Sequence, residues 1–295
     1  MEQREFDYLL EKRLAVLSPE LSGRYRQCMS IFDVLLEKFH QVFPTFTDHS
    51  LLHCMNVLNY SNMIIGENVH RLNADEIYVY LTAVALHDSG MSIDEKRFEE
   101  YVQKSGVSQY VKDHPEESHA SVSRRFHHDF SAVFIRENRR IFEIPDDTYA
   151  DAIARVARGH RRVDLSDRNL YPTDYRIGNG EKVNLAVLGA FLRVADEMDT
   201  ASDRNSRLLY DVYISTGGDA VSRSYFEQCE AIKKVCCEDD RVCIYCCPPD
   251  TAILEKIREY AEGLREKLCS CRDVILSSGD LEFPYREVSI VVSEK

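Results

Sequence analysis

Apolar residues recur every three or four positions up to about residue 200, which predicts one amphipathic helix after another. Pro44 ends the second of these helices, and Thr47 or Asp48 caps the third. The same spacing marks the first two helices at Phe6, Leu9, Leu10 and Leu14, and at Met29, Phe32, Leu35, Leu36 and Phe39. In the third helix it turns His53 inward together with Leu52, Met55, Leu58 and Ile65. Each helix then has one apolar face to bury, which favours a helical bundle.

Local signals mark two further helices. Asn73 followed by Glu76 resembles a capping box at the start of an apolar helix, 77–86, which ends at His87-Asp88-Ser89-Gly90. Another apolar helix begins near Asn184 and runs to Ala195. The polar stretch between them, 161–183, is long for a simple connection, so it is either a lid or binding loop, or a surface excursion.

The pattern changes after about residue 205. Alternating β-branched residues predict strands at 212–215, 242–245 and 288–292, and helical spacing fills 221–236 and 251–272. We therefore expect a mainly α protein with two parts. A helical domain spans residues 1–205, and a small α/β domain with a sheet of at least three strands spans residues 206–295.

Charge narrows the choice of partners. The chain has 50 acidic and 37 basic residues and a net charge of −13, which disfavours a nucleic-acid backbone as the main partner. A small anionic substrate stays compatible, because a metal and a few arginines make a positive pocket even in an acidic protein. We expect a cytoplasmic protein, since no stretch is long and apolar enough to span a bilayer and the start does not resemble a signal peptide.

The cysteines cluster in the last third of the chain and raise the alternative of a structural zinc site. A strand at 242–246 points Cys243 and Cys246 to opposite faces, so they cannot bind one ion. We expect reduced, buried thiols at Cys236, Cys237, Cys243, Cys246, Cys247, Cys269 and Cys271.

Six residues at helix-sized intervals are candidate metal ligands. They are neutral imidazoles and carboxylates, which are natural ligands of divalent metals, and they are His53, His87, Asp88, His119, His160 and Asp196. Burying the His87-Asp88 pair without partners is costly, and an ion would offset that cost. Asp88 can bridge two ions through its two oxygens. The pair His127-His128 competes for the role of His119 or His160, although it follows two arginines in a charged stretch.

The order His, His-Asp, Asp resembles the HD-domain superfamily of metal-dependent phosphohydrolases. The resemblance covers residues of about 30 to 205 and lies in three segments: 53–57 (His-Cys-Met-Asn-Val), 85–91 (Ala-Leu-His-Asp-Ser-Gly-Met) and 192–196 (Leu-Arg-Val-Ala-Asp). Residues 196–199 (Asp-Glu-Met-Asp) and 119–121 (His-Ala-Ser) look most like the HD-CE subgroup. That subgroup occurs in bacterial conflict systems, often joined to chaperone-like ATPase modules.

The resemblance implies an HD-type helical fold in which His53, His87, Asp88 and Asp196 bind a metal. In two-metal branches, His119 and His160 would complete a second site with Asp88 bridging. The chain lacks the Gly-Tyr-Pro signature of the cyclic-dinucleotide phosphodiesterases. A single histidine, followed by Arg161-Arg162, stands where that branch has a His-His pair. These departures leave the substrate open.

Arginines near His160 suit a substrate phosphate, since the guanidinium group binds phosphate bidentately. We predict Arg161, Arg162 and Arg204 as substrate-binding residues. The alternative is that Arg155, Arg158, Arg161 and Arg162 pair with surface acids such as Asp146, Asp147 and Asp151. Asp199, one turn beyond Asp196, either orients a ligand histidine or is a plain surface acid.

The predicted function is a metal-dependent phosphohydrolase that cleaves a phosphoester or phosphoanhydride bond of a nucleotide-like molecule with metal-activated water. One or two divalent ions would be needed, with manganese, iron, magnesium and zinc all compatible. Asp88, His119 and Arg161 are the predicted catalytic residues. The sequence does not identify the acid that protonates the leaving group; His119, His114 or a metal-bound water could do so if only one metal is bound. Two alternatives stay open: a mixed-valent di-iron oxygenase, and a nucleotide-sensing module without catalysis. The α/β domain is a candidate docking surface for a partner protein or a second copy of the chain.

Overall fold

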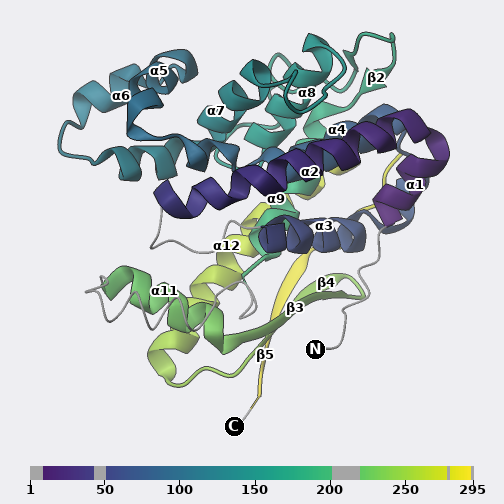
Figure 1. Cartoon of the computed structure of the whole chain (residues 1–295). Helices are drawn as coiled ribbons and strands as arrows, with labels where there is room; N and C mark the ends of the chain where they lie inside the picture. Colours follow the sequence, from purple (N-terminus) through teal and green to yellow (C-terminus); the bar gives the residue numbers. More distant parts are fainter. Residues whose placement is uncertain (1–8, 43–50, 201–219, 278–279, 294–295) are drawn as a thin grey trace.

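Helices make up most of the molecule (Figure 1). The computed structural model describes residues 9–42, 51–200, 220–277 and 280–293. The helical part contains α1 (Leu9–Leu17), α2 (Pro19–Val42), α3 (Leu51–Ile65), η1 (Gly66–His70), α4 (Ala74–Leu86), η2 (Ser89–Ser92), α5 (Glu95–Ser105), α6 (Ser108–Asp113), α7 (His119–Glu137), α8 (Asp147–Arg158), β1 (Tyr175–Arg176), β2 (Lys182–Val183) and α9 (Leu185–Met198). The C-terminal part contains α11 (Ala220–Ala231), β3 (Ile232–Glu238), β4 (Arg241–Cys246), α12 (Thr251–Leu276) and β5 (Glu287–Val292). The mainly α fold with a small C-terminal α/β region is confirmed.

Two helices, α4 and α9, form the centre of the helical part. Residues 77–86 of α4 and 185–192 of α9 are all buried, because neither stretch has a polar face. The predicted N-terminal ends of both helices are correct. Asn73 and Glu76 form a reciprocal capping box, and the Asn184 side chain accepts a hydrogen bond from the Val187 amide, 3.2 Å away. The expectation for α3 was wrong at one position: Leu52 is 38% exposed.

The polar stretch after His160 packs against the N-terminal ends of α4 and α8. Its hairpin, β1 and β2, is anchored where the Gly178 amide donates to Thr148 Oγ1 at 2.8 Å and the Asn179 side chain donates to Asp75 Oδ1 at 3.2 Å. His87 lies at the opposite end of α4, and His160 follows the opposite end of α8. The hairpin is therefore a surface excursion at the ends of α4 and α8 that lie away from those histidines, whereas the start of the stretch, at Arg161, stays beside His127.

A three-stranded sheet forms the C-terminal part in the order β3-β4-β5. β3 and β4 are antiparallel, whereas β4 and β5 are parallel and α12 connects them. The strands expected at 242–245 and 288–292 are present. The helix expected over 221–236 was too long, because it ends at Ala231 and residues 232–238 form β3, where β-branched and apolar side chains pair with β4. The strand expected at 212–215 lies outside the described residues, as does the predicted domain boundary at 205/206.

The cysteines of this sheet are free thiols. Cys243 pairs in register with Cys236 on the neighbouring strand, and Cys246 lies three residues further along β4, on the other face. Within the residues that the structure describes, the cysteines form no cluster that could hold a metal ion.

The C-terminal part packs onto the helical part through α12, which lies along α9, and through β3, which contacts α3. In Figure 1, α12 runs directly below α9. Among the described helices, none is both long enough and apolar enough to cross a lipid bilayer.

Candidate metal centre

Three histidines of the centre occupy equivalent positions at helix ends. His87 is the C-cap of α4, His160 follows the C-cap of α8, and His127 follows a break in α7 at Phe126, whose backbone is not helical. In each case the ring Nδ1 contacts the carbonyl oxygen three residues earlier: Val84 at 2.8 Å, Arg124 at 2.6 Å, and Ala157. Carbonyls in a last helical turn lack the usual partner four residues on, so each ring can satisfy one of them; the Ala157 carbonyl also accepts from the His160 amide at 3.3 Å.

The fourth histidine, His53 in α3, is oriented by an acid. Its Nδ1 lies 2.6 Å from Asp199 Oδ2, and Asn56 donates to the other oxygen of Asp199 at 3.1 Å. All four histidines thus have Nδ1 next to an acceptor, which assigns the proton to Nδ1 and leaves a lone pair on Nε2. Asp199 therefore orients a histidine, which was one of its two predicted roles.

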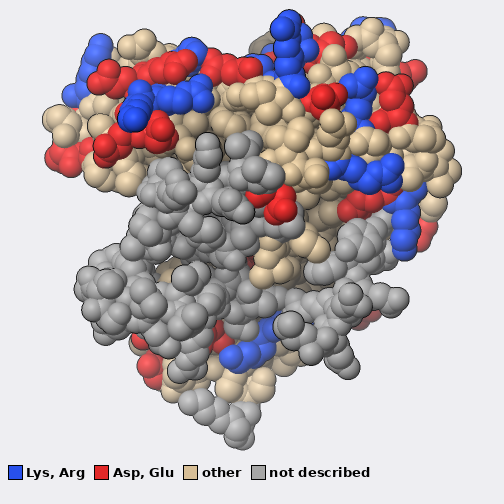
Figure 2. Space-filling model, viewed as in Figure 1, with Lys and Arg blue, Asp and Glu red and all other residues tan. Residues whose placement is uncertain are grey.

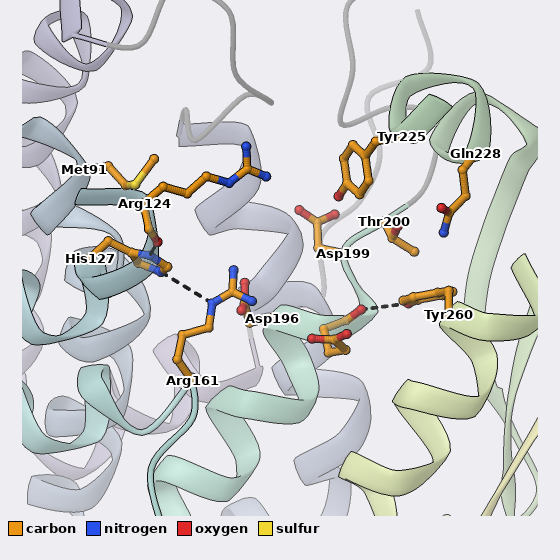
Figure 3. A pocket seen from close by; sticks show the side chains of 11 residues that line it. Met91, Arg124, His127, Arg161, Asp196, Asp199, Thr200, Tyr225, Gln228 and Tyr260 are labelled. Atoms are coloured by element: carbon orange, nitrogen blue, oxygen red, sulfur yellow. Dashed lines mark hydrogen bonds between the residues drawn. The ribbon is translucent and has the colours of Figure 1, made fainter. Parts of the chain in front are cut away.

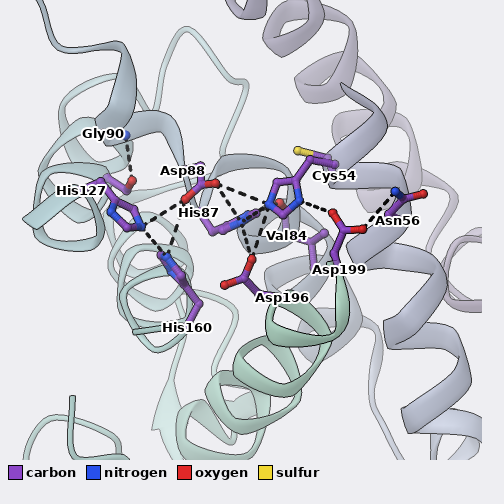
Figure 4. A network of polar contacts seen from close by, with 12 residues as sticks. Cys54, Asn56, Val84, His87, Asp88, Gly90, His127, His160, Asp196 and Asp199 are labelled. Carbon is purple, nitrogen blue, oxygen red and sulfur yellow. Dashed lines mark hydrogen bonds and ion pairs between the residues drawn. The ribbon is translucent and has the colours of Figure 1, made fainter. Parts of the chain in front are cut away.

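The Nε2 atoms converge in two clusters that share Asp88 (Figure 4). In the first cluster, His53, His87, Asp88 and Asp196, the two Nε2 atoms lie 3.1 Å apart and between 3.4 and 3.6 Å from Asp88 Oδ2 and Asp196 Oδ1. In the second cluster, Asp88, His127 and His160, the two Nε2 atoms lie 2.9 Å apart. They are 3.3 and 3.7 Å from Asp88 Oδ1.

These clusters fit divalent metal ions. Donor atoms bound at about 2.0–2.2 Å to one ion lie roughly 2.8–3.6 Å from one another in octahedral or tetrahedral coordination. The separations in the two clusters, 2.9 to 3.7 Å, are close to that range. Two imidazole lone pairs that face each other at 3.1 or 2.9 Å repel unless a cation lies between them. His53 and His87 with Asp196 would hold one ion, His127 and His160 a second, and Asp88 would bridge the two.

Burial keeps the two histidine donors of the second cluster neutral. It lowers the pKa of His127 to about 3 and the pKa of His160 well below its ordinary value. Burial alone would raise the pKa of Asp196, but contact with His87 and the guanidinium of Arg161 outweigh it and hold that pKa well below its ordinary range. Neutral imidazole and ionised carboxylate are the states that bind metal.

Two glycines let the ligand-bearing segments come close together. A Cβ on Gly90 would lie 2.2 Å from the backbone oxygen of His127, so only glycine allows the turn after Asp88 to contact α7 there. The Gly90 amide also donates to Ser131 Oγ at 2.8 Å. A Cβ on Gly159 would lie 3.0 Å from the Cα of Gly189, which brings the residue before His160 against α9.

The structure brings five of the six predicted ligands together: His53, His87, Asp88, His160 and Asp196. His119 does not lie with them, so the prediction that it is a metal ligand was wrong. His119 is exposed in the first turn of α7 and stacks on Phe98 with ring centroids 4.2 Å apart. His127, on the same face of α7 and about 12 Å further along, takes the place expected for His119.

His127 was only a competing candidate in the sequence, because two arginines precede it. Ser123 and Ser131, four residues before and after His127, are buried with it. The same spacing leads back to His119, which is exposed, so the sequence held no signal that separates the two histidines. His114, the other proposed acid, stacks on Tyr110 and lies outside the clusters.

The predicted arginines have different surroundings. Arg161 lies beside the second cluster, with Nε 3.4 Å from His127 Nε2. Arg162 is exposed in an adjoining cavity. Arg155 and Arg158 instead pair with Asp151 at 2.7 Å and Asp129 at 2.6 Å, which matches the alternative of ion pairing with acids. Arg204 lies outside the described residues.

A pocket of about 230 Å³ opens onto the clusters and is called here the central pocket (Figure 3). Arg124, His127 and Arg161 lie on one side of it, and Tyr225, Gln228 and Tyr260 lie on the other. The second group belongs to α11 and α12, so the C-terminal part forms one wall of the pocket. Tyr260 is held in place by the hydrogen bond from its hydroxyl to the Glu197 carbonyl, 2.7 Å long.

Comparison with known proteins adds a family. The family model described as HD-CE matches residues 43–269, which is more than half of the chain and includes both clusters as well as α11 and most of α12. No curated protein matches the chain.

Proposed function

The chain belongs to the HD-CE family, and we propose that it is a metal-dependent phosphohydrolase acting on a nucleotide-like small molecule. The observation that carries the proposal is the pair of clusters on the two oxygens of Asp88. Divalent ions bound there would supply Lewis acidity that lowers the pKa of water and neutralises charge on a phosphoryl group. The reaction adds a water oxygen to phosphorus, breaks the bond from phosphorus to the leaving oxygen, and moves one proton of the water to that oxygen or to solvent.

The chain's own residues position the substrate. Arg161 lies beside the second cluster and lines the central pocket, where its guanidinium can hold non-bridging oxygens of the phosphoryl group. Asp199 and the three backbone carbonyls hold the rings, so the donors need no reorganisation when ions bind. His119 has no catalytic place in this proposal, because it is exposed on the first turn of α7.

The far wall of the central pocket supports a nucleotide-like substrate. Tyr225 and Tyr260 offer aromatic faces, and the amide of Gln228 offers both a donor and an acceptor. A planar heterocycle with polar edges matches that combination. The C-terminal part would then contribute to substrate binding, and docking of a partner protein on it stays a proposal without a described contact.

Metal analysis followed by a substrate panel tests the proposal. The protein as purified should contain divalent metal, and with added manganese it should hydrolyse at least one member of a panel of nucleotides, cyclic dinucleotides and phosphomonoesters. His87→Ala/Asp88→Ala should lose both metal and hydrolysis, whereas His119→Ala, on the same helix as His127, should keep both. Equal hydrolysis by the double variant and the parent would refute the proposal.

A di-iron oxygenase is the second candidate, because four imidazole donors around a bridging carboxylate suit iron as well. Iron content after anaerobic preparation, together with the absence of phosphate release from every member of the panel, would favour it. Nucleotide binding in the presence of metal without any turnover would instead favour a sensing module.

A further inference from the structure

A second cavity adjoins the central pocket and is called here the arginine bay. It measures about 390 Å³, within the range of small-molecule sites. Four of its lining residues are arginines: Arg124 and Arg125 from α7, and Arg161 and Arg162 from the segment after α8. The remaining lining residues are Ser121, His127 and His128, so no acidic side chain among the described residues lines it.

This charge arrangement is unusual for the molecule. The chain carries a net charge of −13, and on the face shown in Figure 2 basic and acidic residues of the helical part are interspersed. Four guanidinium groups around one cavity repel each other, and a bound anion with several charges removes that repulsion. Arg125 is also held in position, by Glu117 at 3.3 Å and by the ring of Tyr110, 5.3 Å from its guanidinium carbon.

The bay is continuous with the proposed reaction site. Arg124, His127 and Arg161 line both the bay and the central pocket, and His127 belongs to the second cluster. A phosphoryl group at the clusters would therefore have further phosphates of the same molecule next to Arg125 and Arg162. Arginine is suited to this role, because its planar fork binds phosphate oxygens in pairs.

We propose that the arginine bay is a second phosphate subsite, so that the substrate is an oligophosphate whose reacting phosphoryl group lies at the metal centre and whose remaining phosphates lie in the bay. Only one part of this proposal, the hydrolysis of the phosphoryl group at the metal centre, rests on the proposed function. The bay itself binds an oligophosphate chain whether or not hydrolysis follows. This oligophosphate is either the triphosphate of a nucleoside triphosphate or part of an inorganic polyphosphate.

Calorimetry on the full chain tests the bay without turnover. The protein is stripped of metal with a chelator, dialysed, and titrated with sodium tripolyphosphate and with orthophosphate. Tripolyphosphate should bind at least about tenfold more tightly than orthophosphate. Arg125→Ala/Arg162→Ala should weaken its binding by about a hundredfold, since each of the two charge-assisted contacts contributes about tenfold. Added salt should weaken the binding of tripolyphosphate by the parent.

The control is Arg140→Ala, which removes the same charge from an exposed arginine that lines neither cavity. This variant should bind tripolyphosphate like the parent. Thermal melting checks folding, and because Arg125 and Arg162 are both exposed the double variant should keep the melting temperature of the parent. Equal affinity of parent and double variant for tripolyphosphate, or no preference of the parent for tripolyphosphate over orthophosphate, would overturn the proposal.

A second titration identifies the source of the phosphate chain. Binding of one of the four ribonucleoside triphosphates more tightly than tripolyphosphate would assign the bay to a nucleotide, and equal binding would assign it to inorganic polyphosphate. In both outcomes the phosphates bind in the arginine bay. Loss of hydrolysis alone would count against the proposed function and not against the bay, because these titrations contain no metal.

Discussion

The first cluster is surrounded by buried helices and acids, whereas the second cluster faces arginines. His87 and Asp196 follow the buried stretches 77–86 of α4 and 185–192 of α9, and a carboxylate, Asp199, orients His53. His127 and His160 are oriented only by backbone carbonyls and lie beside Arg161. Asp88 is common to both clusters, so the difference lies in the other charges: Asp196 and Asp199 favour an ion in the first cluster. The guanidinium of Arg161 also acts on Asp196, but it contacts His127 directly and disfavours an ion in the second cluster most.

This difference indicates separate roles. We propose that the first cluster would retain an ion, and that the second would bind an ion together with an anionic ligand from the adjoining cavities. Asp88 belongs to both and couples them. Four substitutions test this interpretation, in order of decreasing expected effect. The first removes the ligand shared by both clusters, the second removes a ligand of one cluster, and the last two remove residues that hold a ligand histidine in position.

Removing the shared ligand should have the largest effect. Asp88→Ala deletes both bridging oxygens, so metal content measured by mass spectrometry should fall to near zero for both ions. The value of kcat/KM should fall more than about a thousandfold, which corresponds to about 4 kcal/mol. A variant that keeps one tightly bound ion would show that Asp88 does not bridge.

Removing one histidine should separate the clusters. His127→Ala should reduce the metal content from two ions to one, with a loss of about a hundredfold in kcat/KM, or about 3 kcal/mol. His119→Ala is the matched control from the same helix face and should leave metal content unchanged. If His127→Ala releases the ion that His87→Ala also releases, the two clusters do not act separately.

Removing the acid behind His53 should weaken the first cluster alone. Asp199→Asn keeps the size of the side chain but removes the charge next to Nδ1, which should lower the affinity of the first ion by about 10- to 100-fold. Chelator competition measures this affinity. An equal loss of affinity at both clusters would contradict the contrast drawn between them.

The smallest effect is expected at Asn56, which contacts Asp199 and not the histidine itself. Asn56→Ala removes the hydrogen bond to Asp199 but leaves the contact of Asp199 with His53, so the affinity of the first ion should fall only a few-fold, on the order of 1 kcal/mol. The same chelator competition applies. A loss as large as that of Asp199→Asn would mean that Asn56, and not the charge, determines the position of the ring.

Local sequence determined the parts of this protein that depend on short-range chemistry. The capping box at Asn73, the end of α4 at His87 and the buried helix before Asp196 all follow from patterns within one element. The length of the helix before β3 did not follow, because residues 232–238 have both helical spacing and β-branched side chains, and pairing with β4 decides between them.

The candidate metal ligands were also determined partly by local sequence and partly by tertiary structure. Sequence alone determined that histidines and aspartates end apolar helices, since burying them without partners or ions is costly. It could not choose between His119 and His127, which lie on one face of α7 two turns apart. Only the tertiary structure decided that choice, because the close contact of Gly90 with the backbone of His127 fixes which turn of α7 meets Asp88. It also decided that the arginines before His127 and after His160, distant in sequence, surround one cavity.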